Sequence, residues 1–439
     1  MNNLFFSKKA IKPFNTKLKI EGDKSLSIRW ALLASQASGK SFAKNILRSE
    51  DVLSTLSCLK KLGVKIKLTK NDECEITGVG VNGFRYKKAI TLNAGNSGTL
   101  ARLILGLLIH SKEKIRIIGD KSLSRRDFLR VIKPLKKFGA RFNSTKNKLP
   151  ITIKGTKNPK PIKYFENKGS AQCKTAIMLA SLNTEGTTII KAKKSRNHTE
   201  LLFKYLKLPI KVIEKKGFDL IKTEKVLKIN PLNYHIPSDI SSCAFFIVLT
   251  TLSYGSKLIL KNVNVNPSRV GVLKILNKMG VKIIYKNIRY YKGEKTSDLH
   301  VEGRKSFKPI NCPTNLNSSA IDEFLVIFLV AAKAKGISYF KDLSELNQKE
   351  SPRLKWGSKI LNLIGIKTVT TKDSIKIYGN PNLEINNEIE IKNYLKDHRV
   401  FMTSVIAALA FGGKWTIHDK DSIKTSFPSF LKIIKEFKK

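Results

Sequence analysis

Six strongly apolar segments recur along the 439-residue chain, each long enough for a helix of about three turns. A helix that is apolar on nearly all sides has to be surrounded by other elements, so each segment predicts a helix at the centre of a domain. Successive starts are 73, 72, 71, 79 and 78 residues apart. The six segments begin near Ser25, Gly98, Ser170, Ser241, Ala320 and His398.

Five of the six apolar segments end close to a glycine, the residue that most often takes the left-handed conformation that terminates a helix. The second segment, from Gly98 to about His110, has none and departs from the pattern. We therefore expect five of these helices to stop near Gly39, Gly186, Gly255, Gly336 and Gly412.

A second, amphipathic pattern follows the apolar segments: a lysine-rich helix, a glycine and then a strand. A weaker copy at residues 206–212 has Pro209 near the glycine position, and the chain ends in a helix at 430–437, as if a strand from elsewhere completed the last unit. The four clear copies are Leu59–Ile66, Leu135–Phe142, Leu276–Ile283 and Leu361–Lys367.

This repetition predicts an α/β chain of six βαβαββ-like units, each hiding one apolar helix and exposing one lysine-rich helix. Three buried helices walled by sheets make one domain, so six units predict two similar domains with a cleft between them. The period is too long for the common solenoids.

The chain is strongly basic, with 83 Lys and Arg against 33 Asp and Glu, a net charge of +50. Such a balance first suggests a nucleic-acid partner. The lysines are spread along the whole length, however, and no run resembles a basic tail. We interpret the charge as surface composition that also attracts small anionic substrates.

The five cysteines form no CxxC pair and have no metal-ligand spacing with histidine, which favours a reducing, cytoplasmic location. The first 19 residues lack the pattern of a signal peptide. The longest apolar runs, such as Phe324–Ala332, are shorter than the roughly 18 residues that span a bilayer. We expect no membrane insertion.

Polar and charged residues gather where the six apolar helices begin. Helix N-termini present N–H groups and the positive end of the dipole, so six such ends facing one cleft would bind a polyanion. An ordinary N-cap explains any single one, but not six ends that all carry Lys, Arg, Gln, His or carboxylates. The segments are 24–29, 95–99, 170–172, 239–242, 321–323 and 397–399.

These segments resemble, in family order from residue 22 to 428, the motifs of the EPSP synthase family. One glycine-rich match would say little, whereas the ordered set is specific. The matching segments are Gly22–Arg29, Asn93–Thr99 with Arg102, Ser122–Arg126, Ser170–Lys174, Ser195–Glu200, Asp239–Ser242, Ile321–Glu323, Lys349–Arg353, Asp397–Arg399 and Ser426–Pro428.

The resemblance implies the two-domain inside-out α/β barrel of enolpyruvyl transferases, with three repeats in each domain. Residues 23–236 would form an inserted domain, and residues 1–22 plus 237–439 a discontinuous one, with the active site in the cleft between them. The family is usually monomeric. We expect no metal, no organic cofactor, no membrane and no specific nucleic-acid partner.

The activity implied is transfer of the enolpyruvyl group of phosphoenolpyruvate to the 5-hydroxyl of shikimate 3-phosphate, which gives 5-enolpyruvylshikimate 3-phosphate and phosphate. This is a step of the shikimate pathway to chorismate and the aromatic amino acids. The hydroxyl adds to C2 while C3 gains a proton, and a tetrahedral intermediate then loses phosphate. Both substrates carry a phosphate and a carboxylate, so the site needs cations as well as acid–base groups.

Site roles carry over by match to the family motifs. The catalytic residues would be Lys24, Asp322 and Glu350: Asp322 takes the 5-hydroxyl proton, and Glu350 protonates the methylene with help from Lys24. His398 assists or simply orients. Phosphoenolpyruvate would be bound by Lys24, Asn96, Gly98, Arg126, Gln172, Arg353 and Arg399. Shikimate 3-phosphate would be bound by Lys24, Ser25, Arg29, Ser170, Gln172, Ser195, Asp322 and Lys349.

Simpler explanations stand beside these roles. Asp322 could be an N-cap and Glu350 a first-turn acid, while the serines could be caps and the arginines surface cations. The sequence also departs from the family at four positions. Ile28 replaces His or Asn, Asp127 replaces Pro, Thr425 replaces a substrate-binding lysine, and Pro352 replaces an Asp.

Pro352 fits a first helical position after a Ser351 cap, but the pose of Arg353 then has to be maintained without the missing Asp. The motifs look like the family's second class, which often tolerates glyphosate. Gly98, however, leaves room for the inhibitor, so the two features point in opposite directions.

Two other functions are open to such a chain. A UDP-N-acetylglucosamine enolpyruvyl transferase shares fold and donor, but it usually has Lys-Asn where this chain has Lys24-Ser25, and a loop cysteine that is absent between Cys74 and Cys173. A basic nucleic-acid-binding protein would carry stacked aromatics or a basic helix. An inactive paralogue would not be expected to keep the four residues Lys24, Asp322, Glu350 and Arg399.

Overall fold

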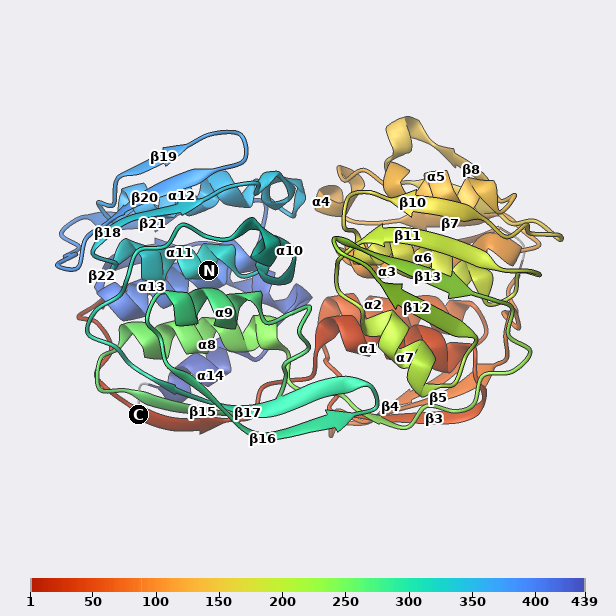
Figure 1. The fold of residues 1–439 in the computed structure, drawn as a ribbon, viewed down its shortest axis with the longest axis horizontal. Helices are drawn as coiled ribbons and strands as arrows, with labels where there is room; N and C mark the ends of the chain where they lie inside the picture. The colour runs from red at the N-terminus through yellow and green to blue at the C-terminus, as the bar shows by residue number, and fades with distance from the viewer. Residues whose placement is uncertain (1, 88, 438–439) are drawn as a thin grey trace. The chain divides into compact units, whose positions relative to one another are not determined.

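The protein, described by a computed structural model over residues 2–87 and 89–437, divides into two compact units (Figure 1). The chain passes from unit 1 to unit 2 after Glu21 and returns after Ile236. Unit 1 comprises Met1–Glu21, Pro237–Tyr290 and Lys295–Lys439, and unit 2 comprises Gly22–Ile236 and Tyr291–Glu294. The short segment Tyr291–Glu294 is the turn of a hairpin whose strands belong mainly to unit 1.

Unit 2 contains three four-stranded sheets among its described residues. Its helices are α1 (Lys24–Ser35), α2 (Glu50–Lys61), α3 (Gly98–Leu107), α4 (Lys121–Ser124), α5 (Leu129–Lys137), α6 (Ala171–Ser181) and α7 (His198–Tyr205). The sheets, in strand order, are β14 (Tyr234–His235), β3 (Ser38–Lys44), β5 (Cys74–Val79) and β4 (Lys65–Leu68); β6 (Ile90–Asn93), β7 (Ile115–Ile118), β9 (Ile151–Lys154) and β8 (Arg141–Ser144); and β10 (Lys163–Glu166), β11 (Thr188–Lys193), β13 (Phe218–Thr223) and β12 (Ile210–Glu214).

Unit 1 is built in the same way, with one four-stranded and two three-stranded sheets in the described chain. Its helices are α8 (Ile240–Leu252), α9 (Gly271–Lys278), α10 (Asn317–Ala320), α11 (Phe324–Ala332), α12 (Arg353–Leu363), α13 (His398–Phe411) and α14 (Phe430–Glu436). The sheets are β2 (Asn15–Leu18), β15 (Lys257–Asn264), β17 (Glu294–Glu302) and β16 (Ile283–Tyr291); β18 (Gly336–Phe340), β20 (Ile375–Gly379) and β19 (Thr368–Thr370); and β21 (Glu388–Ile391), β22 (Gly413–Ile417) and β1 (Leu4–Lys8).

The four-stranded sheets share one strand arrangement. An edge strand pairs in parallel with a strand that follows a buried helix, and two antiparallel strands complete the sheet, as in β6, β7, β9 and β8. In two sheets one member comes from a distant part of the chain: β14 pairs with β3, and β2 with β15. The sheet of β21 and β22 is completed by the N-terminal strand β1, so the expectation that a distant strand completes the last unit is met.

The buried helices are enclosed because their side chains leave no polar face. All nine residues of α11 are buried, as are all residues of α8 except its last. In unit 1, α8, α11 and α13 pack on one another between the sheets (Figure 1). In unit 2, α3 packs closely on α6. The lysines of α2, α5 and α9 are exposed, as the amphipathic pattern predicts.

All five helices end close to the expected glycines, but in four of them the glycine is not the residue that caps the helix. Only Gly412 is the C-cap residue of its helix, α13. The others lie at or shortly before the next strand, where the missing side chain lets a proline ring approach. A built Cβ would lie 3.1–3.5 Å from that ring in each case. The pairs are Gly39 with Pro231, Gly186 with Pro161, Gly255 with Pro13, and Gly336 with Pro309.

The amphipathic helices do end at glycine. Each of the four clear copies has its glycine at positive φ directly after the helix, between 83° and 106°, a conformation that favours glycine. In the weaker copy, Lys207 takes the equivalent conformation at φ 55° after α7. These glycines are Gly63, Gly139, Gly280 and Gly365.

All five cysteines are buried and none is in a disulfide. Burial raises the pKa of the Cys58, Cys74 and Cys173 thiols to about 12, so these thiols stay protonated and unreactive at neutral pH. No described helix has the length and apolarity needed to cross a membrane.

The contact between α3 and α6 depends on a glycine. A Cβ built on Gly106 would lie 2.2 Å from the carbonyl oxygen of Ala176. We expect Gly106→Ala to lower the free energy of unfolding by about 2–3 kcal/mol, because the two backbones have to separate. Helix propensity alone predicts the opposite sign, a gain of about 1 kcal/mol.

Urea unfolding monitored by circular dichroism shows whether Gly106→Ala lowers or raises the free energy of unfolding. Gly357→Ala in α12 is the comparison, since its new methyl meets side chains, the Phe328 ring at 2.7 Å and Leu325 at 3.3 Å, and no backbone atom among its nearest neighbours. A Gly106→Ala protein more stable than the wild type would contradict the close packing.

Candidate active site

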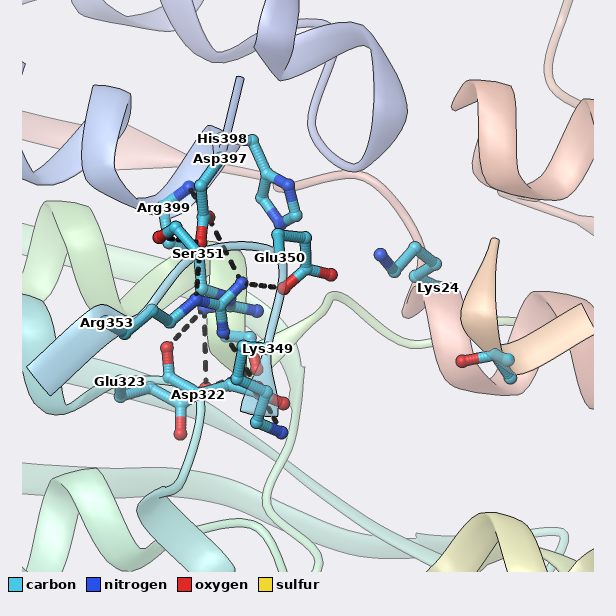
Figure 2. A network of polar contacts seen from close by, with 12 residues as sticks. Lys24, Asp322, Glu323, Lys349, Glu350, Ser351, Arg353, Asp397, His398 and Arg399 are labelled. Carbon is cyan, nitrogen blue, oxygen red and sulfur yellow. Dashed lines mark hydrogen bonds and ion pairs between the residues drawn. The ribbon is translucent and has the colours of Figure 1, made fainter. Parts of the chain in front are cut away.

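Arg353, the first residue of α12, is held among three carboxylates of unit 1 (Figure 2). Its guanidinium binds Asp397 through two bonds, Nε to Oδ2 at 2.9 Å and Nη2 to Oδ1 at 3.2 Å. Nη1 lies 3.3 Å from Oδ1 of Asp322, and Nη2 donates to Oε2 of Glu350 at 2.5 Å. The side chain is 2% exposed, so four charged groups meet where water is largely excluded.

Asp397 organises the start of α13 as well as Arg353. Its carboxylate accepts the backbone N–H of Arg399 at 2.9 Å and the Ser351 hydroxyl at 2.9 Å. Burial by itself would raise the pKa of Asp397, but the Arg353 charge reverses this and holds the pKa below its ordinary value. Asp397 therefore stays ionised and fixes both α12 and α13 to one point.

Asp322 lies in the turn between α10 and α11, and its carboxylate faces cations. Oδ1 is 3.3 Å from Nζ of Lys349, in addition to the Arg353 contact. Arg399 donates from Nη1 to the Asp322 carbonyl at 2.7 Å and lies 3.8 Å from Oε1 of Glu323. Asp322 is therefore not an N-cap: α11 begins at Phe324, and the cap position falls to Glu323, which makes no capping bond.

Two further expectations for this region are wrong. Ser351 does not cap α12, because its hydroxyl is directed to Asp397, and Pro352 occupies the N-cap position without a side-chain bond. Glu350 precedes the helix and is not a first-turn acid. Arg353 is held in place although Pro352 stands where the family has an Asp. Its bidentate partner is Asp397, so no Asp at position 352 is needed to hold it.

His398, the first residue of α13, is 3% exposed, and its Nδ1 lies 3.2 Å from the Thr425 hydroxyl. The residue that departs from the family at position 425 thus holds the imidazole. This contact fits an orienting role for His398 better than a free acid or base.

In unit 2, Lys24 begins α1 and pairs with Asp51 of α2, Nζ to Oδ2 at 2.8 Å. The lysine side chain is 18% exposed and Asp51 is 7% exposed. The Asp51 carboxylate thus directs the Lys24 ammonium group.

A second cluster in unit 2 surrounds the start of α3. The Asn96 amide donates to Asp120 at 2.6 Å, and its oxygen accepts from Nη2 of Arg126 at 3.4 Å. Gly98 is the first residue of α3, and a Cβ built there would lie 3.0 Å from Nη1 of Arg126. Glycine at 98 therefore lets the Arg126 guanidinium lie against the helix start.

Gln172 of α6 is oriented by two neighbours. Its oxygen accepts from Nη1 of Arg102 at 3.2 Å, and its amide donates to the Thr99 hydroxyl at 3.0 Å. Arg102 also donates to the Asp127 carbonyl at 3.2 Å and lies over the Phe128 ring at 4.7 Å. These two bonds fix the orientation of the Gln172 amide, with its oxygen toward Arg102 and its nitrogen toward Thr99.

The residues expected to bind shikimate 3-phosphate in unit 2 lie at the starts of α1, α6 and α7. Arg29 donates to the Ser25 carbonyl and to the Thr199 hydroxyl. Ser170 caps α6 through the N–H of Cys173 at 3.2 Å. The Ser195 hydroxyl oxygen is buried and has no hydrogen-bond partner among the described residues.

Five of the six buried helices begin with a side-chain cap among the described residues. The sixth, α11, has none. Aspartate caps add a negative charge at α1, α8 and α13, which offsets part of the positive potential there. The capping residues are Asp23, Ser97, Ser170, Asp239 and Asp397.

Sequence reasoning missed several supporting residues. Asp397 lies within a matched motif but received no role, although its place before a buried helix was a signal. Asp51, Asp120 and Thr199 are far in sequence from the cations and amide they hold, so no spacing could have revealed them. Among the residues that the structure describes, no three His, Cys, Asp or Glu side chains are grouped to hold a metal ion.

Comparison with solved structures identifies the class. The enolpyruvyl transferase NikO from Streptomyces tendae superposes with a TM-score of 0.77 over 99% of this chain and 97% of its own, at 13% identity. An EPSP synthase structure from Acinetobacter baumannii gives a TM-score of 0.85 at 34% identity, with the same coverage. The mixed α/β fold is therefore that of the enolpyruvyl transferases.

Sequence comparison identifies the family. The family model described as EPSP synthase (3-phosphoshikimate 1-carboxyvinyltransferase) matches residues 8–434. The 3-phosphoshikimate 1-carboxyvinyltransferase of Ruthia magnifica is 40% identical over 97% of both chains. That of Zymomonas mobilis is 37% identical over 97% of this chain and 94% of its own. This chain belongs to the EPSP synthase family, as its motifs indicated.

The Arg353–Asp397 pair predicts a pH-dependent loss of stability. We expect Asp397→Asn to lower the free energy of unfolding by about 3 kcal/mol at pH 7, since it leaves a buried guanidinium without its main partner. The native pKa lies below the unfolded value of about 3.9, so the carboxylate stabilises the fold above about pH 4 and this contribution is lost as the pH falls through the native pKa.

Urea unfolding of the wild type and Asp397→Asn at several pH values between 7 and 3 measures this difference. Ser351→Ala removes one hydrogen bond to the same carboxylate oxygen of Asp397. It is expected to lower the free energy of unfolding by at most about 1 kcal/mol, without the pH dependence. A difference between wild type and Asp397→Asn that stays constant from pH 7 to 3 would contradict the ionised pair.

Proposed function

We propose that this protein transfers the enolpyruvyl group of phosphoenolpyruvate to the 5-hydroxyl of shikimate 3-phosphate, releasing phosphate. The observation that carries the proposal is the group of Asp322 and Glu350 with Lys349, Arg353 and Arg399. It supplies two carboxylates for two proton transfers and three cations for anionic substrates. Membership of the EPSP synthase family across residues 8–434 supports the same reaction.

In the proposed mechanism, Asp322 accepts the proton of the 5-hydroxyl as that oxygen attacks C2 of phosphoenolpyruvate. Glu350 delivers a proton to the C3 methylene. Lys349 and Arg353 flank these carboxylates, and a neighbouring cation favours the ionised form of a carboxylate. A substrate carboxylate or phosphate that competes for Arg353 would release Glu350 to act as an acid. Lys24 assists, and the tetrahedral intermediate then expels phosphate while the C3 methyl group loses a proton, which restores the enol double bond.

The substrates are assigned to the cations by charge and shape. Phosphoenolpyruvate binds to the arginines, whose planar forks match carboxylate and phosphate groups, together with Asn96, Gly98, Gln172 and Lys24. Shikimate 3-phosphate binds to hydroxyls, Lys349 and the residues at the start of α1. The arginines for phosphoenolpyruvate are Arg126, Arg353 and Arg399, and the remaining shikimate 3-phosphate residues are Ser25, Arg29, Ser170, Ser195, Gln172, Lys24 and Asp322.

Both units take part in the proposed reaction, since each carries residues that the motifs assign to both substrates. We also infer six repeats of one βαβαββ unit, three in an inserted domain of residues 23–236 and three in a discontinuous domain of residues 1–22 and 237–439, in an inside-out barrel arrangement. The shared strand order of the four-stranded sheets and the recurring Gly–Pro contacts support this inference.

The enzyme is proposed to act as a cytoplasmic monomer without metal or cofactor. The UDP-N-acetylglucosamine transferase reading is not favoured, because the relatives at 35–40% identity carry the 3-phosphoshikimate name. A primary nucleic-acid function has no support in a fold shared with enolpyruvyl transferases.

Phosphate release tests the reaction. We expect the purified protein to release phosphate from phosphoenolpyruvate only when shikimate 3-phosphate is present. Asp322→Ala is expected to lower kcat by about 10²–10⁴-fold, the usual contribution of a general acid or base. Asp373→Asn should behave as wild type, because Asp373 is only partly buried and lies in the bend between β19 and β20. Release without shikimate 3-phosphate, or full activity of Asp322→Ala, would contradict the assignment.

Gly98 gives a second kinetic prediction. A methyl at this position would come within 2.8 Å of Nη1 of Arg102 and 3.0 Å of Nη1 of Arg126, so both guanidinium ends have to shift slightly. We expect Gly98→Ala to fold normally, to raise the KM for phosphoenolpyruvate roughly five- to tenfold, equivalent to about 1 kcal/mol, and to weaken inhibition by glyphosate.

Initial rates with varied phosphoenolpyruvate and glyphosate measure both effects. Gly217→Ala is the control: its methyl meets no atom within 4 Å, so the strain of alanine at φ 82° is expected to lower stability without changing KM or inhibition. Unchanged KM and inhibition in Gly98→Ala would exclude the steric argument.

A further inference from the structure

Helix α7 begins with three buried polar residues that each reach a different part of unit 2. His198 Nδ1 lies 2.6 Å from Oε1 of Glu294, in the hairpin turn grouped with unit 2. Glu200 Oε1 lies 2.5 Å from Nζ of Lys174 on α6, and the lysine side chain is wholly buried. Thr199 stands between them and is 1% exposed. A helix start this heavily anchored holds Thr199 rigidly in place.

Thr199 connects α7 to the arginine of α1. Its Oγ1 accepts from Nε of Arg29 at 3.0 Å and lies 2.8 Å from Oγ1 of Thr175 on α6. A guanidinium can only donate, so the Thr199 oxygen is the acceptor, and its own hydrogen remains available for Thr175. The Arg29–Thr199–Thr175 chain thus joins α1, α7 and α6 through hydroxyls that are excluded from water.

The direction of the Arg29 guanidinium follows from two anchors. Nε is held by Thr199, and Nη1 donates to the Ser25 carbonyl at 3.1 Å. Because the guanidinium is planar, fixing two of its N–H directions fixes the plane and the aim of the whole fork. Arg29 is 5% exposed, so water cannot readily replace either partner.

We propose that Thr199 is a positioning residue that aims Arg29 at shikimate 3-phosphate. The inference rests on the proposed function, in which Arg29 binds that substrate. Thr175 supports Thr199 through its hydroxyl, and the Lys174–Glu200 ion pair fixes α7 against α6. Removing the Thr199 oxygen leaves a buried N–H of a charged group without an acceptor, so the guanidinium turns toward another partner and loses its aim.

Thr199→Val tests this role, because valine keeps the branched shape and removes the hydroxyl. We expect the KM and the calorimetric Kd for shikimate 3-phosphate to rise roughly tenfold, which corresponds to about 1.4 kcal/mol. The KM for phosphoenolpyruvate and kcat at saturation should stay within about twofold, since the cations assigned to the reacting groups are untouched. Thr199→Ser, which restores the oxygen, should return the Kd close to the wild-type value.

Thr223→Val is the matched control. Thr223 is 1% exposed, lies in the same unit, and accepts from the Ser181 hydroxyl of α6 at 2.8 Å. It has no contact with Arg29, so the same substitution should lower the thermal midpoint without changing the Kd. If Thr199→Val is too unstable to purify, Thr199→Ala supplies the same comparison.

A double-variant cycle with Arg29→Lys checks the route of the effect. Lysine has no Nε–H for Thr199 to accept, so in the Arg29→Lys background Thr199→Val should change the Kd by less than about twofold. A full tenfold effect in that background would overturn the proposal, as would an unchanged Kd in Thr199→Val alone or an equal rise in Thr223→Val.

The wild type separates this inference from the proposed function. A wild-type protein that neither binds shikimate 3-phosphate nor releases phosphate overturns the function and the inference together. A wild type that does both, beside a Thr199→Val protein of equal affinity, overturns the positioning role alone.

Discussion

Helices that are apolar on every side impose the main constraint on this structure. Such a helix cannot lie at a surface, so sheets and amphipathic helices have to enclose α8, α11 and α13 in unit 1, and likewise α3 and its neighbours in unit 2. The flanks of these helices carry no chemistry. Their N-terminal ends are where polar side chains can meet backbone N–H groups, and the proposed site residues gather there.

The ends of these helices are held by ion pairs that also set the charge of the functional groups. Asp397 caps α13 and forms an ion pair with Arg353, and Asp51 forms an ion pair with Lys24 in the other unit. Aspartates at the helix starts reduce the positive potential locally, so the cations do not simply repel one another. In the proposed site, a substrate anion would replace one carboxylate partner of a cation by another, which requires less reorganisation than bringing a bare cation out of water.

The same principle operates through neutral groups around α7. Thr199 supplies only one oxygen, yet that oxygen determines where a nearly buried guanidinium points. Fully buried partners such as Lys174 and Glu200 keep this oxygen in position. Residues behind the arginines thus contribute as much to the arrangement of the site as the arginines themselves.

The sequence by itself determined the apolar helices, the amphipathic helix–glycine–strand segments and the family, because these depend on periodicity and on motifs whose order survives in one chain. It predicted Gly63 and Gly365 correctly as helix ends, since that conformation is local. It was wrong about Gly39 and Gly336, because the positive φ of these glycines, 121° and 125°, belongs to the entry into the next strand and not to the end of the helix.

Only the tertiary structure decided the partners of the site residues. Asp51 with Lys24, Asp397 with Arg353 and Thr199 with Arg29 are separated by 27, 44 and 170 positions. The Pro352 departure put the pose of Arg353 in question, but the bidentate partner of Arg353 comes from the start of another helix. The physical reason is that burial makes a charged side chain depend on whichever group folding brings within hydrogen-bonding distance, and sequence spacing does not record that distance.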